Sequence, residues 1–220
     1  MLTGPTGSGK STSLYAILNE IKSPAKNIVS VEDPVEYKMD EINQVQVKPE
    51  IGLTFAAALR SFLRQDPDIM LVGEVRDLET AQICIRSALT GHLVLSTLHT
   101  NDAPSAVSRL MDMGIEPYML APSLLLIVAQ RLVRRLCPDC KVAYEPTSAQ
   151  LKGASIKAEL IYGPKGCSKC NNTGYKGRIC IVEVLPITPD IQDLINQRAS
   201  FQKVREVAKA AGMKSLYESG

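Results

Sequence analysis

The hydrophobic residues of the chain gather in short apolar runs that each end abruptly in polar residues. Three of these runs are rich in β-branched residues and cover residues 28–31, 69–72 and 93–97. Near-continuous apolar runs of this length are typical of strands that are buried on both faces of a parallel sheet. We therefore predict three buried parallel strands whose carboxyl ends lead into polar loops.

Helical patterns lie between these strands, and most of them follow a capping residue. The predicted helices cover Lys10–Ile21, Phe55–Leu63, Leu78–Leu89 and Ala103–Met113. Thr54, Asp77 and Asp102 directly precede the last three as N-caps. Because strands and helices alternate, we expect a doubly wound α/β domain that binds ligands at the carboxyl ends of its strands.

The character of the sequence changes after Arg135, where two cysteine pairs and many Gly and Pro residues begin. A hairpin strand is predicted at Arg178–Leu185, and a helical tail from Ile191 has Ser200 as a cap and Gly212 as a stop. We therefore divide the chain into a core at 1–136, a small insertion at 137–178, and a strand with a C-terminal helical segment at 179–220.

Composition excludes several classes of protein. The 220 residues are 45% hydrophobic and carry a net charge of only +2, without a long run of like charges, which argues against nucleic-acid binding. The longest apolar stretch, Met119–Ala129, contains a proline and is shorter than the roughly 18 residues of a membrane span. No signal peptide is recognisable, so the six cysteines are expected in a reducing compartment, where paired cysteines bind metal more often than they form disulfides.

The first candidate site is a glycine-rich loop that leads into the first predicted helix. It fits the pattern G-x-x-x-x-G-K-[ST], with backbone N–H groups placed to surround phosphates. Its residues are Gly4, Pro5, Thr6, Gly7, Ser8, Gly9, Lys10 and Ser11, followed by Thr12. Lys10 is expected to reach the β- and γ-phosphates and Ser11 to offer its hydroxyl to Mg²⁺. The alternative is a merely flexible Gly/Ser turn.

Acidic residues follow two of the predicted strands. Glu74 ends one strand and is the expected carboxylate on the Mg²⁺ side, whereas Glu32, Asp33 and Glu36 form a second acidic group, of which Glu32 and Asp33 are candidate nucleotide contacts. The alternative is that these residues are solvated loop carboxylates.

Two histidines flank the third strand. His99 follows the strand and is a candidate contact of the γ-phosphate, and His92, which precedes the strand, is a candidate nucleotide-binding residue. Each is alternatively a histidine hydrogen-bonded in a turn. Four arginines are candidates for stabilising charge or for ordinary surface ion pairs: Arg60, Arg64, Arg76 and Arg86.

Four cysteines form two C-x-x-C pairs separated by 26 residues: Cys137, Cys140, Cys167 and Cys170. Two such pairs place four thiolates tetrahedrally, which predicts a structural zinc site without an open position for catalysis. A redox pair or four unrelated thiols are the alternatives. Cys84 is expected in the core, and Cys180 follows the second pair in a strand.

Taken together, these segments resemble the type II secretion and type IV pilus assembly ATPases. Residues 4–11, 31–37, 64–77 and 90–101 are similar to the Walker A, Asp box, Walker B and His box of that family. Residues 130–140 and 166–178 resemble the tetracysteine zinc element of its assembly branch, which pilus-retraction motors lack.

The resemblance implies a P-loop NTPase fold of the RecA-like kind and Mg²⁺-dependent hydrolysis of ATP to ADP. It implies that Glu74 is the Walker B carboxylate, that Glu36 positions the attacking water, and that His92 and His99 are the His-box pair. Family members form hexameric rings on the cytoplasmic face of the inner membrane, where they work with a platform protein and a membrane-recruiting partner to assemble pilins or pseudopilins.

The sequence departs from the family at three places. Only three residues precede Gly4, so we expect the strand before Walker A and an upstream domain that supplies arginines in trans to be absent, and this chain alone to be a weak ATPase. The chain also stops where the family continues in a helical segment, and Cys180 stands where glycine is usual. Two other functions stay open at this point: a P-loop phosphotransferase with a zinc-containing lid, and a nucleic-acid-stimulated ATPase with a zinc ribbon.

Overall fold

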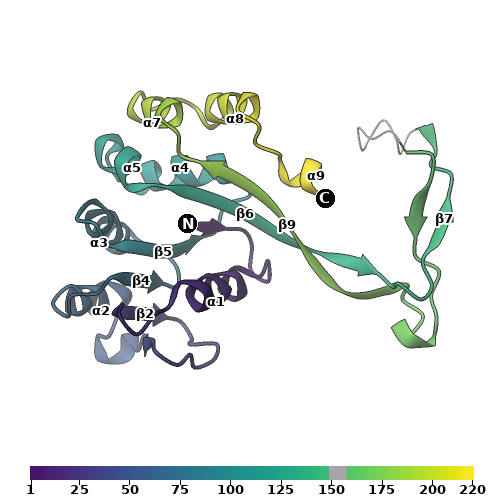
Figure 1. The fold of residues 1–220 in the computed structure, drawn as a ribbon. Coiled ribbons are helices and arrows are strands. Elements are labelled where there is room, and N and C mark those ends of the chain that lie inside the picture. Colours follow the sequence, from purple (N-terminus) through teal and green to yellow (C-terminus); the bar gives the residue numbers. More distant parts are fainter. Residues whose placement is uncertain (149–157) are drawn as a thin grey trace. The chain divides into compact units, whose positions relative to one another are not determined.

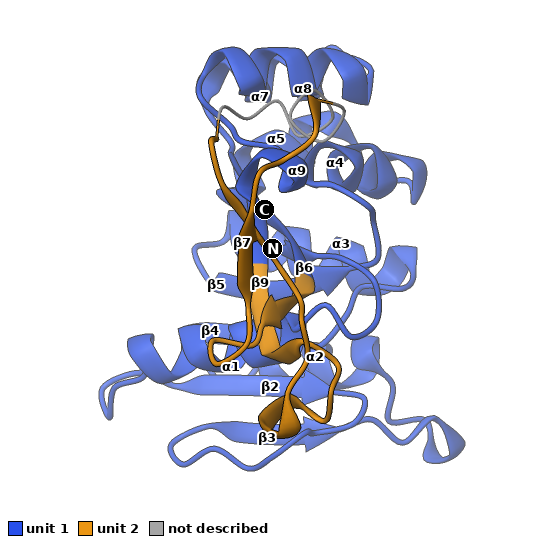
Figure 2. Ribbon diagram, turned by 90° about the vertical axis from the view of Figure 1, so that its right-hand side faces the viewer, with its two compact units in different colours: residues 1–131, 181–220 blue, residues 132–180 orange. Residues whose placement is uncertain are grey.

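The computed structural model of the chain describes residues 1–148 and 158–220, which group into two compact units (Figures 1 and 2). Unit 1 contains residues 1–131 and 181–220, and unit 2 is drawn from residues 132–180. The C-terminal segment thus belongs to the same unit as the predicted core. The three-part division with boundaries after residues 136 and 178 stays a prediction.

Unit 1 is built on a seven-stranded sheet with the order β3-β2-β4-β5-β1-β6-β9. Its strands are β1 (Leu2–Thr3), β2 (Ile28–Glu32), β3 (Asn43–Gln46), β4 (Ile69–Val72), β5 (Leu93–Leu98), β6 (Leu126–Leu136) and β9 (Tyr175–Pro186). Neighbouring strands from β3 to β6 pair in parallel, and Figure 1 shows β6 and β9 running in opposite directions. This confirms the predicted α/β fold with a mostly parallel sheet.

The helices of unit 1 include the four that the sequence predicts, which begin at Lys10, Phe55, Leu78 and Ala103, and two short ones that it does not predict, at Pro117–Ser123 and Leu216–Ser219. They are α1 (Lys10–Ile21), α2 (Phe55–Phe62), α3 (Leu78–Leu89), α4 (Ala103–Asp112), α5 (Pro117–Ser123), α7 (Pro189–Asn196), α8 (Phe201–Ala210) and α9 (Leu216–Ser219), with a short 3₁₀ turn at Pro49–Ile51. The side chains of Thr54, Asp77 and Asp102 each accept a hydrogen bond from a backbone N–H of the following helix. These caps satisfy N–H groups that have no partner inside the helix.

Two apolar clusters pack against the opposite faces of the sheet. Along β4, Ile69 and Leu71 belong to one cluster and Met70 and Val72 to the other, as the alternation of side chains in a strand requires. Helix α1 supplies the first cluster with Leu14, Tyr15 and Leu18, whereas α2 to α5, α7 and α8 supply the second. Burying each large apolar side chain contributes about 1.5–3 kcal/mol, which fixes the strands that carry the site.

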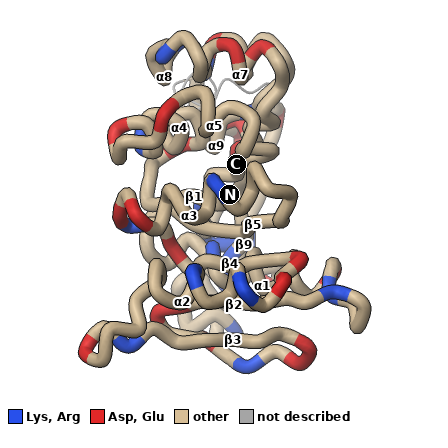
Figure 3. The backbone as a smooth tube through the Cα atoms, turned by 90° about the vertical axis from the view of Figure 1, so that its left-hand side faces the viewer, with Lys and Arg blue, Asp and Glu red and all other residues tan. Residues whose placement is uncertain are grey.

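Charge is mixed over the surface. Figure 3 shows Lys and Arg interspersed with Asp and Glu along the backbone of unit 1, in keeping with the net charge of +2. In the ranges 1–148 and 158–220, no helix combines the length and the apolar character that crossing a membrane would take.

Unit 2 contains a small antiparallel pair and a cysteine-rich turn. Strand β7 (Val142–Tyr144) pairs with β8 (Ile161–Gly163), and a 3₁₀ turn covers Ser168–Cys170. The guanidinium of Arg134 lies 3.9 Å from the ring centre of Tyr175. Because this unit buries few apolar side chains, its four cysteines are the main candidates for holding it together.

Candidate functional site

The glycine-rich loop lies between β1 and α1, where the chain approaches β6 closely. The expectation that no strand precedes this loop is wrong, because Leu2 and Thr3 pair in parallel with both β5 and β6. A Cβ atom on Gly4 would lie 2.6 Å from the carbonyl oxygen of Gln130 and 2.6 Å from the hydroxyl of Ser8, so only glycine fits there. The buried amide of Gln130 donates a hydrogen bond of 2.8 Å to the carbonyl oxygen of Ser8. Through Gln130, strand β6 therefore packs against the glycine-rich loop and fixes its backbone.

The ammonium of Lys10 folds back onto this loop. It donates to the carbonyl oxygens of Gly4 and Pro5 at 2.8 and 3.1 Å. Burial lowers the pKa of Lys10, the charge of Glu74 raises it, and that of Arg131 lowers it again. Glu74 and Arg131 therefore lie near enough to Lys10 for their charges to act on it. Ser11 and Thr12 are exposed in the first turn of α1, where the helix dipole favours an anion.

Glu74 follows β4 and is the centre of a charged cluster. Its side chain is 15% exposed and contacts the guanidinium of Arg76, and its other oxygen lies 3.4 Å from Nε2 of His99. Arg76 also lies 3.6 Å from the carboxylate of Asp33. The hydrogen bond between Arg76 and Glu74 raises the pKa of the Arg76 guanidinium. The structure thus brings together residues from the polar ends of β2, β4 and β5.

Hydrogen bonds fix these strand ends to one another. The hydroxyl of Thr97 donates to the carbonyl oxygen of Gly73 at 2.6 Å, and the N–H of Val75 donates to the carbonyl oxygen of Thr97 at 3.0 Å. The hydroxyl of Thr3 accepts from the N–H of Thr100 at 2.9 Å, which joins β1 to the segment after β5. The loops after β1, β4 and β5 are therefore held in register.

The second acidic group divides into a buried and an exposed part. Glu32 is 4% exposed and its carboxylate accepts from Tyr15, Ser30 and Gln44. Glu36 is exposed in the loop after β2, and its N–H donates to the hydroxyl of Tyr15 at 3.2 Å. The predicted direct contact of Glu32 with nucleotide gains no support from this burial and stays a prediction.

His92 lies away from this edge of the sheet. It precedes β5, and its Nδ1 lies 3.0 Å from the carbonyl oxygen of Ser87 and 3.1 Å from the hydroxyl of Thr90. These contacts fit the alternative given for His92, a histidine that is hydrogen-bonded in a turn. The turn lies at the opposite end of β5 from His99. The predicted role of His92 in nucleotide binding finds no support within this chain and stays a prediction.

Of the four candidate arginines, Arg76 contacts the acidic cluster. Arg60 contacts Glu79, and Arg64 donates to the carbonyl oxygen of Arg60, as expected for side chains on a helix surface. Arg131 was not predicted from the sequence; its guanidinium donates to Asn101 after β5 and lies next to Gly4. Tyr15 and Gln44 were not predicted either, although Tyr15 lies four residues after Ser11 on the same helix.

The four paired cysteines lie together in unit 2. Their sulfur atoms are all within 4.8 Å of one another, and the Sγ of Cys170 lies 3.8 Å from those of Cys140 and Cys167. Thiolates around a tetrahedral zinc at about 2.3 Å are separated by about 3.8 Å. Desolvation raises the pKa of Cys170, but hydrogen bonds from the N–H groups of Cys167 and Gly174 and from the thiols of Cys167 and Cys140 together lower it to about 6. The cluster therefore fits a zinc ion.

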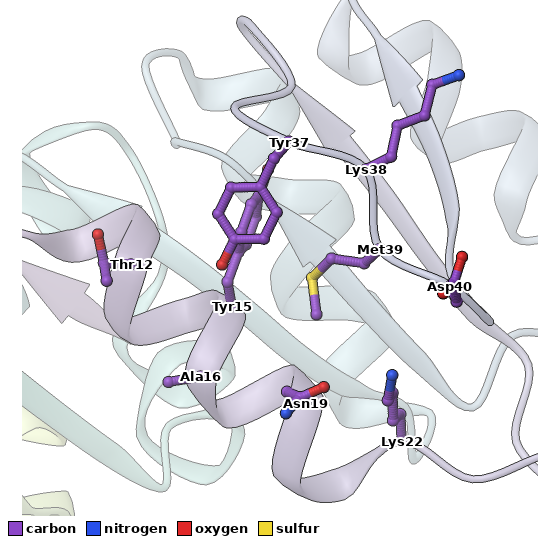
Figure 4. A pocket seen from close by; sticks show the side chains of 9 residues that line it. All are labelled: Thr12, Tyr15, Ala16, Asn19, Lys22, Tyr37, Lys38, Met39 and Asp40. Carbon is purple, nitrogen blue, oxygen red and sulfur yellow. The ribbon is translucent and has the colours of Figure 1, made fainter.

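A pocket of about 440 Å³ lies next to the loop after β2 (Figure 4). It is lined by Thr12, Tyr15, Ala16, Asn19, Lys22, Tyr37, Lys38, Met39 and Asp40. The rings of Tyr15 and Tyr37 meet edge to face with centres 4.6 Å apart, so the loop packs directly on α1.

Comparison with known proteins matches the whole chain to one family. The family described as "Type II/IV secretion system protein" matches residues 1–220. The chain is 53% identical to a type II secretion system ATPase E of Vibrio cholerae, over 96% of this chain and 42% of that protein. It is 53% identical to a type IV pilus assembly ATPase PilB of Myxococcus xanthus, over 100% of this chain and 40% of that protein. The chain thus spans about two fifths of the length of these relatives.

Among solved structures, the chain is similar to the pilus retraction motor PilT with bound ADP. The TM-score is 0.73 at 30% identity, covering 99% of this chain and 54% of that one. A DotB ATPase of Yersinia pseudotuberculosis is similar with a TM-score of 0.69 at 26% identity, over 96% of this chain and 50% of that one.

Proposed function

Because the chain belongs to the type II/IV secretion system protein family, we propose that it hydrolyses ATP as the motor part of a machine that assembles a type IV pilus or a type II secretion pseudopilus. The observation that carries this proposal is the convergence of a phosphate-binding loop, Glu74 and His99 at one edge of a parallel sheet. A γ-phosphate needs positioning and charge stabilisation more than covalent help, and these residues supply both.

The nucleotide would bind with its phosphates at the loop of residues 4–9 and the N-terminus of α1. Lys10 would exchange its bonds to the carbonyl oxygens of Gly4 and Pro5 for phosphate oxygens. The oxygens of Ser11 and Glu74 are of the type that Mg²⁺ binds, and the ion, when bound, neutralises the charge on the β- and γ-phosphates. Glu36 would orient the attacking water, and His99 would contact the γ-phosphate.

Unit 2 is proposed to hold one structural zinc ion through Cys137, Cys140, Cys167 and Cys170. With four thiolates available, no coordination position is left for a substrate, so the ion would stabilise the fold of the unit rather than take part in hydrolysis.

The larger assembly is proposed from the relatives. Their names assign them to type II secretion and to type IV pilus assembly at equal identity, so the proposal covers both machines. By the family resemblance, we propose a homohexamer on the cytoplasmic face of the inner membrane that binds a membrane platform protein and a recruiting partner.

Phosphate release tests this proposal. With Mg²⁺ and ATP, the protein should release inorganic phosphate without any acceptor, and a Glu74→Gln variant should not. Transfer of phosphate to an added nucleotide in place of its release would indicate a phosphotransferase instead. Stimulation by DNA or RNA that falls steeply with salt would indicate a nucleic-acid-dependent enzyme.

A further inference from the structure

The buried carboxylate of Glu32 is surrounded by hydrogen-bond donors on both of its oxygens. One oxygen accepts from the hydroxyl of Ser30 at 2.6 Å and from the amide of Gln44 at 3.2 Å. The other accepts from the hydroxyl of Tyr15. Burying a carboxylate destabilises a fold unless hydrogen bonds replace those it loses to water. Apolar residues of similar volume often give equal or greater stability in the same space. Packing alone therefore does not explain why a carboxylate is buried at this position.

The hydroxyl of Tyr15 connects this carboxylate to the loop after β2. It donates to Glu32 and accepts a bond of 3.2 Å from the N–H of Glu36. Burial, followed by the bond to Glu32, raises the pKa of Tyr15, so the hydroxyl keeps its proton and the direction of both bonds is fixed.

Gln44 holds the other side of the same loop. Its amide nitrogen donates to Glu32 and to the carbonyl oxygen of Tyr37, each at 3.2 Å, and its oxygen accepts from the N–H of Met39 at 2.7 Å. The backbone is therefore held on both sides of the exposed Glu36 side chain by two residues that share one buried carboxylate.

Tyr15 also relates this loop to the phosphate site. It lies four residues after Ser11 on α1, so the two residues are one helical turn apart on neighbouring positions of the helix surface. The helix that presents Lys10 and Ser11 to the phosphates thus also carries the hydroxyl that fixes the backbone of Glu36. Figure 4 shows the ring of Tyr15 directed from α1 toward the loop that carries Tyr37.

We propose that Tyr15 and Glu32 are positioning residues that hold Glu36 at a fixed place relative to the γ-phosphate. This inference rests on the proposed function, in which Glu36 orients the attacking water. A positioned carboxylate is effective only at hydrogen-bond distance from the water, so a displaced loop lowers the rate without weakening the binding of ATP.

The test is Tyr15→Phe, which removes one hydroxyl and keeps the ring. In the full chain we expect kcat to fall about tenfold or more while KM for ATP changes less than about twofold. Amide hydrogen exchange at Glu36 should accelerate, because its N–H loses its acceptor. Tyr118→Phe makes the same chemical change at an exposed site on α5 and should leave both measurements unchanged.

A double-variant cycle separates positioning from general damage. If Tyr15 acts through Glu36, then Tyr15→Phe should cause no further loss in a Glu36→Gln background. A further loss there of the same size, or a wild-type kcat in Tyr15→Phe, would overturn the inference. Gln44→Ala, with the same expected loss of kcat at constant KM, provides a second variant if Tyr15→Phe folds poorly.

The proposed function can fail separately. If Glu36→Gln alone hydrolyses ATP at the wild-type rate, then the role assigned to Glu36 is wrong and the positioning inference falls with it. If Glu36→Gln hydrolyses ATP much more slowly, but still measurably, and Tyr15→Phe is fully active, only the positioning inference is wrong.

Discussion

Lys10 donates a hydrogen bond of 2.8 Å to the carbonyl oxygen of Gly4, six residues earlier in the same loop. A second bond, of 3.1 Å, runs from the same ammonium to the carbonyl oxygen of Pro5. A phosphate that enters the loop competes with two neutral carbonyl groups, and a charged acceptor forms the stronger bond. A bound phosphate would therefore take over the bonds that Lys10 makes with these carbonyl oxygens.

Lys10→Ala should weaken the binding of ATP itself. Hydrogen bonds to charged groups contribute about 1.5–3 kcal/mol, so the dissociation constant should rise by about 10-fold to 150-fold. Titration with a fluorescent ATP analogue measures this change. Lys22→Ala, at the other end of α1, is the matched control and should bind normally. If the affinity for ATP is unchanged in Lys10→Ala, then Lys10 does not contact the phosphates.

Glu74→Gln should retain ATP binding and lose turnover. The carboxylate acts through Mg²⁺ and on charge that develops during transfer, whereas Lys10 contacts phosphates of the ground state. The same titration, combined with a phosphate-release assay, separates the two effects. An equal loss of affinity in Lys10→Ala and Glu74→Gln would contradict the different roles assigned to them.

One zinc ion per chain should be found by elemental analysis of protein purified without chelators. Structural zinc contributes on the order of 10 kcal/mol in small peptide sites, so Cys137→Ser should abolish zinc retention and expose unit 2 to proteolysis while unit 1 stays intact. Cys180→Ser, outside the cluster, should keep the full stoichiometry. Protein without zinc would end the assignment.

Two glycines of unit 2 offer a matched comparison. Gly174 and Gly177 have φ angles of +76° and +77°, so alanine at either position carries a left-handed backbone cost of about 1–2 kcal/mol. Only at Gly174 would the new Cβ also lie 2.4 Å from the Cβ of Pro164, whereas nothing lies within 4 Å at Gly177. Gly174→Ala should therefore lose zinc to a competing chelator much faster than Gly177→Ala. Equal rates would show that this turn adapts to the clash.

The elements that the sequence predicts best are those whose signal is local. Continuous apolar runs mark β2 and β4, and the caps Thr54 and Asp77 mark helix starts within a residue. Strand β3 escapes prediction because Val45 is the single apolar residue of Asn43–Gln46, too weak a local signal, and its pairing with β2 provides its structure.

In the candidate site, too, the sequence predicts residues that lie in a local pattern and not those that are joined by tertiary contacts. The loop of residues 4–11 and the four cysteines carry fixed spacings, so the chain pattern alone identifies them. The contacts of Tyr15 with Glu32 and Glu36 join residues 17 and 21 positions apart, and no local pattern encodes them. Such contacts depend on how α1 packs over the sheet, which only the folded chain reveals.

The route of the chain through unit 1 has an evolutionary consequence. The chain leaves this unit along β6 and re-enters it along β9, and these strands are neighbours that run in opposite directions (Figure 1). Neighbouring antiparallel strands can be joined by a two-residue turn. Exchange of residues 132–180 for an Asn-Gly turn would leave the order of the seven strands unchanged. A single genetic event could therefore add or remove the cysteine-bearing segment in one lineage without rebuilding the nucleotide-binding sheet.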